Sequence, residues 1–568
     1  MHLLPCLRLG ANNLLKFYEV GFSCKVVIDD EISSDDFEHL KYLLEKNYHA
    51  YNIEFVRIYT LSAMVLKLLY THIEVLKKHI TIVVHKSRLS RYLHILGINS
   101  HFESQIKERY RCNPNANILA IGGSADSGEK IIDILSAIDT KRFCIFIIQH
   151  ISPDKEGVFD QILSRLVESD VSYAKDGDKV KLGHIYIASR DKHMLIKDER
   201  IILDDGEYVN AARPSISTSF NALSDAYKEN FLGILECGYG LDGVDALSTL
   251  KNNNSTIIIQ DPKSCRASSI VKQAKAQGIY DFVFSTSEIC SYLNFMGVNF
   301  EIQEQWIKYL LEEVYKKYEY DFRLYQPALV KRRVSAFMIK HGIKDMKTLV
   351  VLVLYFKSAF RSLFLEISIN VTEFFRKHSS TLSLIEALQE YRHSYNIKIW
   401  SAGCSSGEEV YSTAIILREL GLLHKSLIYA TDFNPVVIQE AKNGIYPIDV
   451  FQHAKEKYAD LNLESSLDQY FNIYHNMAEV KKEIKEKVMF FVHNLEKDSV
   501  FNEFDIIECK NVLIYFNDDL QEHVFQLFYD SLKFGGYLFL GPSESLPKSY
   551  ESRFKVCDKS FKTYKKVL

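Results

Sequence analysis

The stretch IGGSADSG at residues 121–128 places small and polar residues directly after the apolar run NILA. Three interpretations are open: a loop that cradles a phosphate, a sharp turn that presents Ser124 as a nucleophile, or a plain strand-to-helix connection. A phosphate loop of the GxxxxGK[ST] type needs a lysine directly after its second glycine. Here Glu129 follows Gly128 and a lysine comes only at position 130, so the first interpretation fails.

A serine hydroxyl is a poor nucleophile unless a histidine removes its proton, so the second interpretation requires a base and an acid nearby. The apolar run FCIFIIQH ends in His150, and NFLGILECGYGLDG runs into a glycine-rich turn that carries Asp242. The carboxyl ends of the strands share one edge in a doubly wound parallel sheet. Backbone N–H groups of the glycine turns there suit an oxyanion. Ser124, His150 and Asp242 together favour a serine hydrolase.

The stretch WSAGCSSGEEVYS at 400–412 follows the apolar run NIKI and precedes a helical pattern. Small residues let the backbone bend closely around a ligand, and a helix start favours polar or anionic groups. The run LIYATDF then places Asp432 at the end of the next expected strand, where a carboxylate suits ribose hydroxyls. Because GCSSGEE lacks the GxGxxG of pyrophosphate-binding loops, S-adenosylmethionine fits better than NAD.

The elements that must position these residues follow from the alternation of strand-like runs with helical periodicity, which predicts α/β domains. A chain of 568 residues is too long for one core. Polar or helix-preceding segments at 101–117 and 287–305 indicate boundaries. We predict an α/β multidomain protein with a small α/β domain (1–105), a doubly wound parallel-sheet domain (115–290), a small helical domain (300–372) and a Rossmann-like domain (373–568).

The composition is that of an ordinary soluble protein. A net charge of −4 gives no general reason to expect nucleic-acid or membrane binding. The longest apolar stretch, 349–356, is far shorter than the roughly 20 residues of a membrane span, and the first residues lack a signal-peptide pattern. The ten cysteines form no CxxC and no zinc spacing. We therefore expect a cytoplasmic protein with free thiols and no metal site.

The first hundred residues give the order β-α-β-β-α and resemble STAS-type (anti-anti-sigma) domains, with Ser62 in the turn where that family carries a phosphorylatable serine. Asp29 and Asp30 end a strand like the acidic pair of a response-regulator receiver. However, no aspartate ends the expected strand at 53–59. We expect a regulatory or interaction domain that accepts no phosphate at Asp29 or Asp30.

Residues 117–285 resemble the catalytic domain of chemotaxis protein-glutamate methylesterases. The resemblance rests on IGGS, IIQHISPD, HIYIASRDKHM, RPSIS and CGYGLDG, which occur in the order and spacing of that family. It implies that Ser124 is the nucleophile, His150 the base and Asp242 the acid that orients the base. The implied reaction is hydrolysis of a glutamate methyl ester on a chemoreceptor, which releases methanol.

The chain departs from the methylesterase pattern at three places. Ala125-Asp126-Ser127 stand where the family usually has Thr-Gly-Gly, Cys237 replaces a threonine and Tyr239 a methionine. Asp126 brings negative charge close to the expected oxyanion. An inactive esterase half that is retained for docking therefore stays open as an alternative.

Residues 305–565 resemble the chemotaxis receptor methyltransferases through NVTEFFR, WSAGCSSGEE, ATDF with AKNGIYP, HNL, ECKNVLIYF and GGYLFLGPSESL, in family order. Lys510 stands where the family usually has arginine, which lysine does not match in bidentate contacts. The resemblance implies that Arg376 and Tyr515 lie beside the transferred methyl group. It also implies a cofactor site made of Asn370, Thr372, Arg376, Glu409, Asp432, Asn494, Leu495, Lys510 and Asn511.

These observations predict a bifunctional chemotaxis adaptation enzyme. One half methylates chemoreceptor glutamates with S-adenosylmethionine, and the other removes the methyl groups. The helical segment 319–342 corresponds to the family's receptor-engaging region, but AFMI follows Arg333 where basic residues are usual. Two alternatives remain: a methyltransferase with an inactive esterase half, and a signalling scaffold in which neither site turns over.

Overall fold

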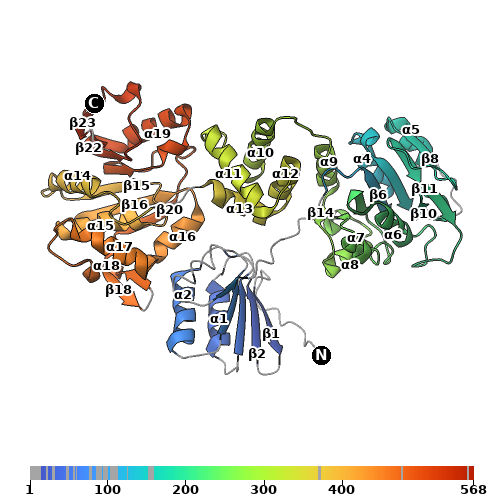
Figure 1. The fold of residues 1–568 in the computed structure, drawn as a ribbon, viewed down its shortest axis with the longest axis horizontal. Helices are drawn as coiled ribbons and strands as arrows, with labels where there is room; N and C mark the ends of the chain where they lie inside the picture. Colours follow the sequence, from blue (N-terminus) through green and yellow to red (C-terminus); the bar gives the residue numbers. More distant parts are fainter. Residues whose placement is uncertain are drawn as a thin grey trace. The chain divides into compact units, whose positions relative to one another are not determined.

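The structure is a computed structural model, and its elements are drawn in Figure 1. The chain divides into two compact units, residues 1–107, 321–334 and 364–568 in one and 108–320 and 335–363 in the other. The structure describes residues 15–20, 23–28, 32, 34–45, 50–55, 58, 61–75, 80–84, 93, 100–102, 113–124, 126–150, 159–368, 372–474, 477–558 and 562–568.

The N-terminal domain is built on a five-stranded sheet in the order β1-β2-β3-β4-β5. β1 runs antiparallel to β2, and the remaining neighbours are parallel. The predicted order β-α-β-β-α omitted β1, α2 and β5, which are short and carry little periodicity. The last helix of that order falls on residues 87–98, of which the structure describes only residue 93. The resemblance to STAS-type domains stays a prediction, and Asp29 and Asp30 lie outside the described residues. The elements are β1 (Leu15–Val20), β2 (Ser23–Ile28), α1 (Ser34–Glu45), β3 (Ala50–Phe55), α2 (Ala63–Tyr70), β4 (Ile80–Val84) and β5 (Ser100–Phe102).

The middle domain contains a seven-stranded parallel sheet in the order β14-β13-β12-β6-β7-β9-β8, which confirms the predicted doubly wound architecture. Helices cover both faces of the sheet (Figure 1). The strands are β6 (Ile118–Gly123), β7 (Cys144–Gln149), β8 (Asp170–Tyr173), β9 (His184–Ile187), β12 (Phe231–Leu235), β13 (Thr256–Gln260) and β14 (Phe282–Phe284), with a hairpin of β10 (His193–Lys197) and β11 (Arg200–Asp204).

The central strands β6 and β12 are buried along their whole length. Continuous apolar runs are expected of parallel strands that are covered on both faces. The helices are α4 (Gly128–Ser136), α5 (Phe159–Leu166), α6 (Ile216–Tyr227), α7 (Leu247–Asn252), α8 (Ser269–Gln277) and α9 (Thr286–Phe295). Helix α9 occupies much of the segment 287–305 that the sequence indicated as a boundary.

The helical segment that follows is divided between the two units, because α11 and α13 each have residues in both. Among the described residues no single helix is long and apolar enough to cross a membrane. The pair α12 and α13 reaches that length and composition only together, with a bend of 111°. The helices are α10 (Gln303–Tyr318), α11 (Pro327–His341), α12 (Met346–Tyr355) and α13 (Lys357–Ile367).

The C-terminal domain has a seven-stranded sheet in the order β20-β16-β15-β21-β22-β24-β23, parallel except for the pairs made by β24. The central β15 ends directly before the turn that carries Gly403. The strands are β15 (Ile397–Ala402), β16 (Ser426–Asp432), β20 (Val488–Val492), β21 (Phe504–Cys509), β22 (Leu532–Leu540), β23 (Phe554–Asp558) and β24 (Thr563–Lys566).

A second, three-stranded antiparallel sheet in the order β17-β19-β18 is inserted between β16 and β20 of the C-terminal domain. Its strands are β17 (Ile445–Pro447), β18 (Phe471–Tyr474) and β19 (Met477–Val480). The helices of the domain are α14 (His378–Gln389), α15 (Glu408–Glu419), α16 (Pro435–Asn443), α17 (Ile448–Ala459), α18 (Lys482–Lys485) and α19 (Asp518–Ser531).

Candidate active sites

The three predicted hydrolase residues follow three adjacent strands of the middle sheet. Ser124 follows β6, His150 follows β7 and Asp242 lies in the turn after β12, and β6 is hydrogen-bonded to both other strands. The His150 backbone N–H donates to the Gly123 carbonyl at 3.2 Å, which joins the first two strand ends. The sheet topology therefore brings the three residues to one edge.

Asp242 is the most firmly held of the three. Its carboxylate accepts hydrogen bonds from His150 Nε2 at 2.8 Å, Ser215 Oγ at 2.7 Å and the backbone N–H groups of Ile216 and Ser217 at 2.6 and 3.1 Å. Burial opposes ionisation of this side chain, but the hydrogen bonds outweigh it and lower its pKa. A carboxylate that stays charged fixes a histidine ring and stabilises its protonated form.

The His150 ring is oriented by this contact. With Nε2 donating to Asp242, Nδ1 is the nitrogen left to accept a proton. The side chain is 22% exposed, whereas Asp242 is 2% exposed. The imidazole is thus partly open to solvent, whereas the carboxylate that orients it is buried.

The turn that carries Ser124 packs directly on the turn after β12. The Ser124 N–H donates to the Cys237 carbonyl at 3.0 Å, and Ser127 donates through Oγ to the Ser124 carbonyl at 2.6 Å. A Cβ at Gly238 would lie 2.6 Å from the Ser124 Cβ, so only glycine fits at that position. Both glycine-containing turns thus hold the serine backbone.

Asp126 occupies the loop in which the chain departs from the methylesterase pattern. Its φ of 73° is left-handed, and its carboxylate accepts a 2.7 Å hydrogen bond from the Arg266 backbone N–H. The charge that the sequence placed near an oxyanion is therefore engaged by the segment after β13. Ala125 lies outside the described residues.

The cysteine prediction is wrong for one pair: Cys237 and Cys265 form a disulfide. Their separation of 28 residues carries no sequence signal, because only the fold places the segment after β13 beside the turn after β12. The other cysteines whose side chains the structure describes are free, namely Cys144, Cys290, Cys404, Cys509 and Cys557.

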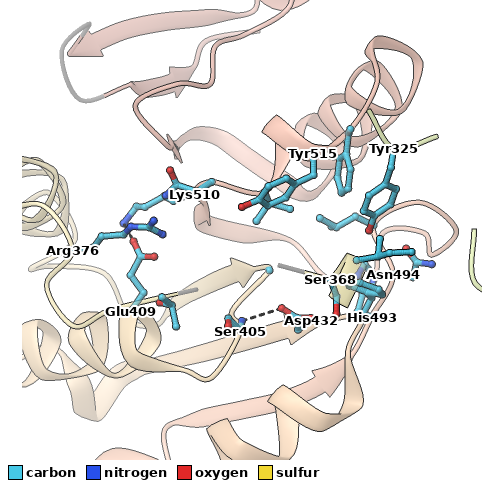
Figure 2. Close-up of a pocket in the computed structure, with 18 residues that line it drawn as sticks. Tyr325, Ser368, Arg376, Ser405, Glu409, Asp432, His493, Asn494, Lys510 and Tyr515 are labelled. Carbon is cyan, nitrogen blue, oxygen red and sulfur yellow. Dashed lines mark hydrogen bonds and ion pairs between the residues drawn. The ribbon is translucent and has the colours of Figure 1, made fainter. Parts of the chain in front are cut away.

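The C-terminal domain contains a cavity at the carboxyl edge of its main sheet (Figure 2). The cavity is partly open to solvent. Asn370 lies outside the described residues. The other predicted cofactor residues all line the cavity, together with Tyr515: Thr372, Arg376, Glu409, Asp432, Asn494, Leu495, Lys510 and Asn511.

One end of the cavity is organised by Asp432 at the end of β16. Its carboxylate accepts from the backbone N–H groups of Ser405 and Asn434, each at 2.9 Å. Burial raises the pKa of Asp432 to about 6, although these amides oppose the shift. Asn494 and His493 lie on the same side of the cavity in Figure 2. This end offers a carboxylate and polar groups of the kind that hold a nucleoside.

The opposite end carries charged side chains, with Arg376, Glu409 and Lys510 close together in Figure 2. The Lys510 ammonium lies 2.7 Å from a carboxylate oxygen of Glu508 and 3.2 Å from one of Glu409. Burial alone would lower the pKa of Lys510, but these two carboxylates outweigh it and raise that pKa. A cation and carboxylates at one end suit the zwitterionic end of an amino acid.

Several lining residues were not predicted. Tyr325, Ile367 and Ser368 come from the helical segment, and His493 comes from the HNL motif itself. The motif is a signal that identifies His493. The helical segment has no motif that identifies its lining residues, because they come to lie at the cavity only when the chain folds.

Glu544 was also missed, although it lies in the quoted motif GGYLFLGPSESL. It is 4% exposed and accepts from the backbone N–H groups of Asn511, Val512 and Leu513 at 3.0, 2.8 and 2.8 Å. Tyr515 lies in the short 3-10 helix that begins at Leu513. Glu544 therefore holds the backbone of the loop that lines the cavity.

The cavity retains unused hydrogen-bonding groups. Within the part of the chain that the structure describes, the buried hydroxyl oxygens of Ser405 and Thr372 have no hydrogen-bond partner. Unpaired buried hydroxyls are costly unless a ligand pairs with them. A polar, partly charged ligand such as S-adenosylmethionine fits this donor set.

Comparison with known proteins finds matches to two enzyme families. The SAM-binding domain model of the CheR methyltransferase family matches residues 370–562, its all-alpha domain model matches 305–368, and the CheB methylesterase model matches 119–293. A Pseudomonas putida protein named as methyltransferase Cher3 is 38% identical over 46% of this chain and 96% of its own. A Leptospira interrogans protein named as a protein-glutamate methylesterase/protein-glutamine glutaminase is 30% identical over 31% of this chain and 92% of its own.

The chain belongs to the CheR and CheB families. The predicted fusion of a methylesterase and a methyltransferase is thereby confirmed at the level of family and fold, and the cofactor of the CheR domain is S-adenosylmethionine. The Thermotoga maritima CheB methylesterase catalytic domain is 26% identical, with a TM-score of 0.30 over 31% of this chain and 97% of its own.

Proposed function

We propose that the chain both adds and removes methyl groups on glutamate side chains of chemoreceptors. The observation that carries this proposal is the coexistence of an ordered His150–Asp242 pair beside Ser124 with a separate cavity built around Asp432. Each constellation belongs to its own sheet, and each supports one direction of the cycle. A scaffold without turnover has no use for unpaired cavity hydroxyls or an oriented imidazole.

In the CheR domain the residues of the cavity bind the cofactor and align the receptor glutamate with it. S-adenosylmethionine supplies an electrophilic methyl group when it is bound. Asp432 would hold the ribose hydroxyls, while Glu409, Arg376 and Lys510 would hold the charged amino-acid end. A receptor glutamate is already ionised at neutral pH. The site therefore needs no proton acceptor, and alignment with exclusion of water supplies the catalysis.

Tyr515 and Arg376 are assigned to the glutamate that is methylated. Arg376 acts on Tyr515 electrostatically, opposing the rise that burial causes in the pKa of the phenol. Burial outweighs Arg376 and the pKa of Tyr515 is raised, so the phenol stays protonated at neutral pH and is a hydrogen-bond donor. A guanidinium and a phenolic donor together suit a carboxylate that must be held in line with a methyl group.

In the CheB domain the Ser124 hydroxyl attacks the ester carbonyl as His150 accepts its proton, and methanol leaves with a proton returned by His150. Water then cleaves the acyl-enzyme in the same way. Asp242 keeps its charge and stabilises the imidazolium. The carboxylate of Asp126 is occupied by the Arg266 N–H, which supports an active esterase over the alternative of a domain retained only for docking.

The test mixes the purified chain with a chemoreceptor fragment and S-adenosylmethionine that carries a labelled methyl group. We expect incorporation of label into the fragment, followed by release of labelled methanol. Incorporation without methanol, also from a fragment methylated beforehand, would favour the inactive-esterase alternative. A variant that restores Thr-Gly-Gly at 125–127 then tests whether the altered loop is the cause. Absence of both products would favour the alternative of a signalling scaffold in which neither site turns over.

A further inference from the structure

Two of the departures from the methylesterase pattern, Cys237 and Asp126, meet beside Ser124. Cys237 accepts the Ser124 N–H through its carbonyl and bonds through sulfur to Cys265. The neighbour of Cys265, Arg266, donates its backbone N–H to Asp126 in the nucleophile turn. The disulfide and the altered loop are therefore parts of one connected structure.

The segment 264–267, which we call the clamp, is attached to the nucleophile turn and to the turn after β12. Lys130 at the start of α4 donates from Nζ to the Ser264 carbonyl at 2.8 Å, and the Gly238 N–H donates to the Ala267 carbonyl at 2.8 Å. The Cys237–Cys265 bond is the only covalent link among these contacts, in the part of the chain that the structure describes.

We propose that Cys237–Cys265 is a thiol–disulfide exchange site, reduced by small thiols or dithiols, whose redox state sets the activity of the Ser124 turn. The effect on hydrolysis rests on the proposed esterase function, whereas the exchange reaction does not. Disulfides of cytosolic proteins are usually transient and redox-sensing.

The two sulfurs differ in access. Cys237 is 0% exposed, whereas Cys265 is partly exposed. An incoming thiolate therefore attacks Cys265 Sγ, the S–S bond breaks and its electron pair goes to Cys237 Sγ. A second thiol then attacks the mixed disulfide and releases the Cys265 thiolate. Overall, two thiols supply two electrons and two protons, and leave as one disulfide.

Glu236 is placed to assist the leaving sulfur. Its side chain is 0% exposed, one carboxyl oxygen lies 4.0 Å from Cys237 Sγ, and the other has no hydrogen-bond partner among the described residues. Burial raises the pKa of Glu236 to about 7, opposed by the charge of Lys130. A protonated carboxyl next to Cys237 gives its proton to the departing thiolate.

Reduction changes what holds Asp126. In the oxidised form the covalent bond keeps the clamp in place, so the Arg266 N–H stays on the Asp126 carboxylate. Without the bond the clamp keeps its hydrogen bonds and the packing of Cys265 and Ala267, but Asp126 is held less firmly away from an oxyanion at Ser124. A negative charge there raises the barrier for attack. The oxidised chain is thus the faster esterase.

The experiment uses the full chain, purified without reductant and then treated with dithiothreitol. Alkylation and peptide mapping should show the 237–265 cross-link before treatment and two new thiols after it. Amide hydrogen exchange at residues 122–128 and 264–268 should accelerate on reduction. Methanol release from a methylated receptor fragment should fall roughly tenfold, less than the loss of an oxyanion donor.

Variants separate the steps. The double variant Cys237→Ser with Cys265→Ser should show the hydrogen exchange and methanol release of the reduced chain, and dithiothreitol should change neither. Cys290→Ser, which removes a free thiol on α9, should behave like the unaltered chain. Glu236→Gln should slow reduction severalfold without changing its end point. The fold of each variant is compared by circular dichroism.

Absence of the cross-link would overturn the proposal. Unchanged amide hydrogen exchange after reduction of the cross-link would overturn it as well. If amide hydrogen exchange accelerates but neither form releases methanol, the thiol–disulfide exchange site stands and the proposed esterase activity fails. If both forms release methanol at the same rate although amide hydrogen exchange accelerates, the proposed control of hydrolysis by the disulfide is wrong.

Discussion

At the scale of single residues, hydrogen bonds define the arrangement of the proposed hydrolase site. Asp242 accepts from several donors, His150 is held by Asp242, and Ser124 is held through its backbone. The Ser124 hydroxyl and the His150 imidazole are the two groups to which the proposed reaction assigns chemistry. Side-chain changes at these two positions test the assignment without disturbing the sheet.

Ser124→Ala removes the nucleophile and should lower methanol release by several orders of magnitude. His150→Ala should cost about as much, and the double variant little more, because the two residues act as one unit. Methanol from a methylated receptor fragment is the readout. Ser164→Ala on the exposed face of α5 is the control. Persistent methanol release in Ser124→Ala would show that another group is the nucleophile.

Asp432→Asn should weaken the binding of S-adenosylmethionine by roughly the 1.5–3 kcal/mol of a hydrogen bond to a charged group. The ionised carboxylate is the better acceptor for ribose hydroxyls, so binding stabilises the charged form. Since burial raises the pKa of Asp432 to about 6, affinity should fall as the pH drops through that value, by at most about tenfold per pH unit.

Titration calorimetry between pH 5 and 8 measures this affinity. Asp460→Asn, at the exposed end of α17, is the matched control and should keep the pH dependence. An affinity in Asp432→Asn equal to that of the unaltered chain would remove Asp432 from the cofactor site.

At the scale of elements, strand ends were predictable and the contacts around them were not. Continuous apolar runs ending in Ser124, His150 and Asp432 are local signals, and each falls at the carboxyl end of a strand. The Cys237–Cys265 bond and the approach of Tyr325 to the cavity join segments that are far apart in sequence. Such pairings depend on packing, which periodicity does not contain.

Glu544 shows how one side chain supports an element. Its carboxylate holds the N–H groups of the loop after β21, and the Gly541 N–H as well. Glu544→Gln keeps the size but loses the charge and an acceptor, so thermal stability should fall and the affinity for S-adenosylmethionine with it, by about 1–3 kcal/mol.

Thermal unfolding and calorimetry measure both effects. Glu551→Gln, exposed just before β23, is the control. If Glu544→Gln loses stability but binds normally, the carboxylate supports the fold and not the shape of the cavity.

At the scale of the whole molecule, the two sites belong to different compact units. Ser124 and its partners lie in residues 108–320, whereas the cavity is lined only by residues of the other unit. Simultaneous turnover would consume S-adenosylmethionine in a cycle without net change of the receptor. An enzyme of this kind therefore needs control of at least one half, and the clamp beside Ser124 is one place for it.

Separate sites predict separable activities. In Ser124→Ala, methyl transfer to a receptor fragment should stay near the value of the unaltered chain, and net methylation should rise because removal stops. In Asp432→Asn, methanol release from a fragment methylated beforehand should be unchanged, because no residue of the Ser124 site lines the cavity in the described part of the chain. Labelled methyl incorporation and methanol are measured on the same samples. A loss of methyl transfer in Ser124→Ala, with the fold intact, would show that the two sites are coupled through the chain.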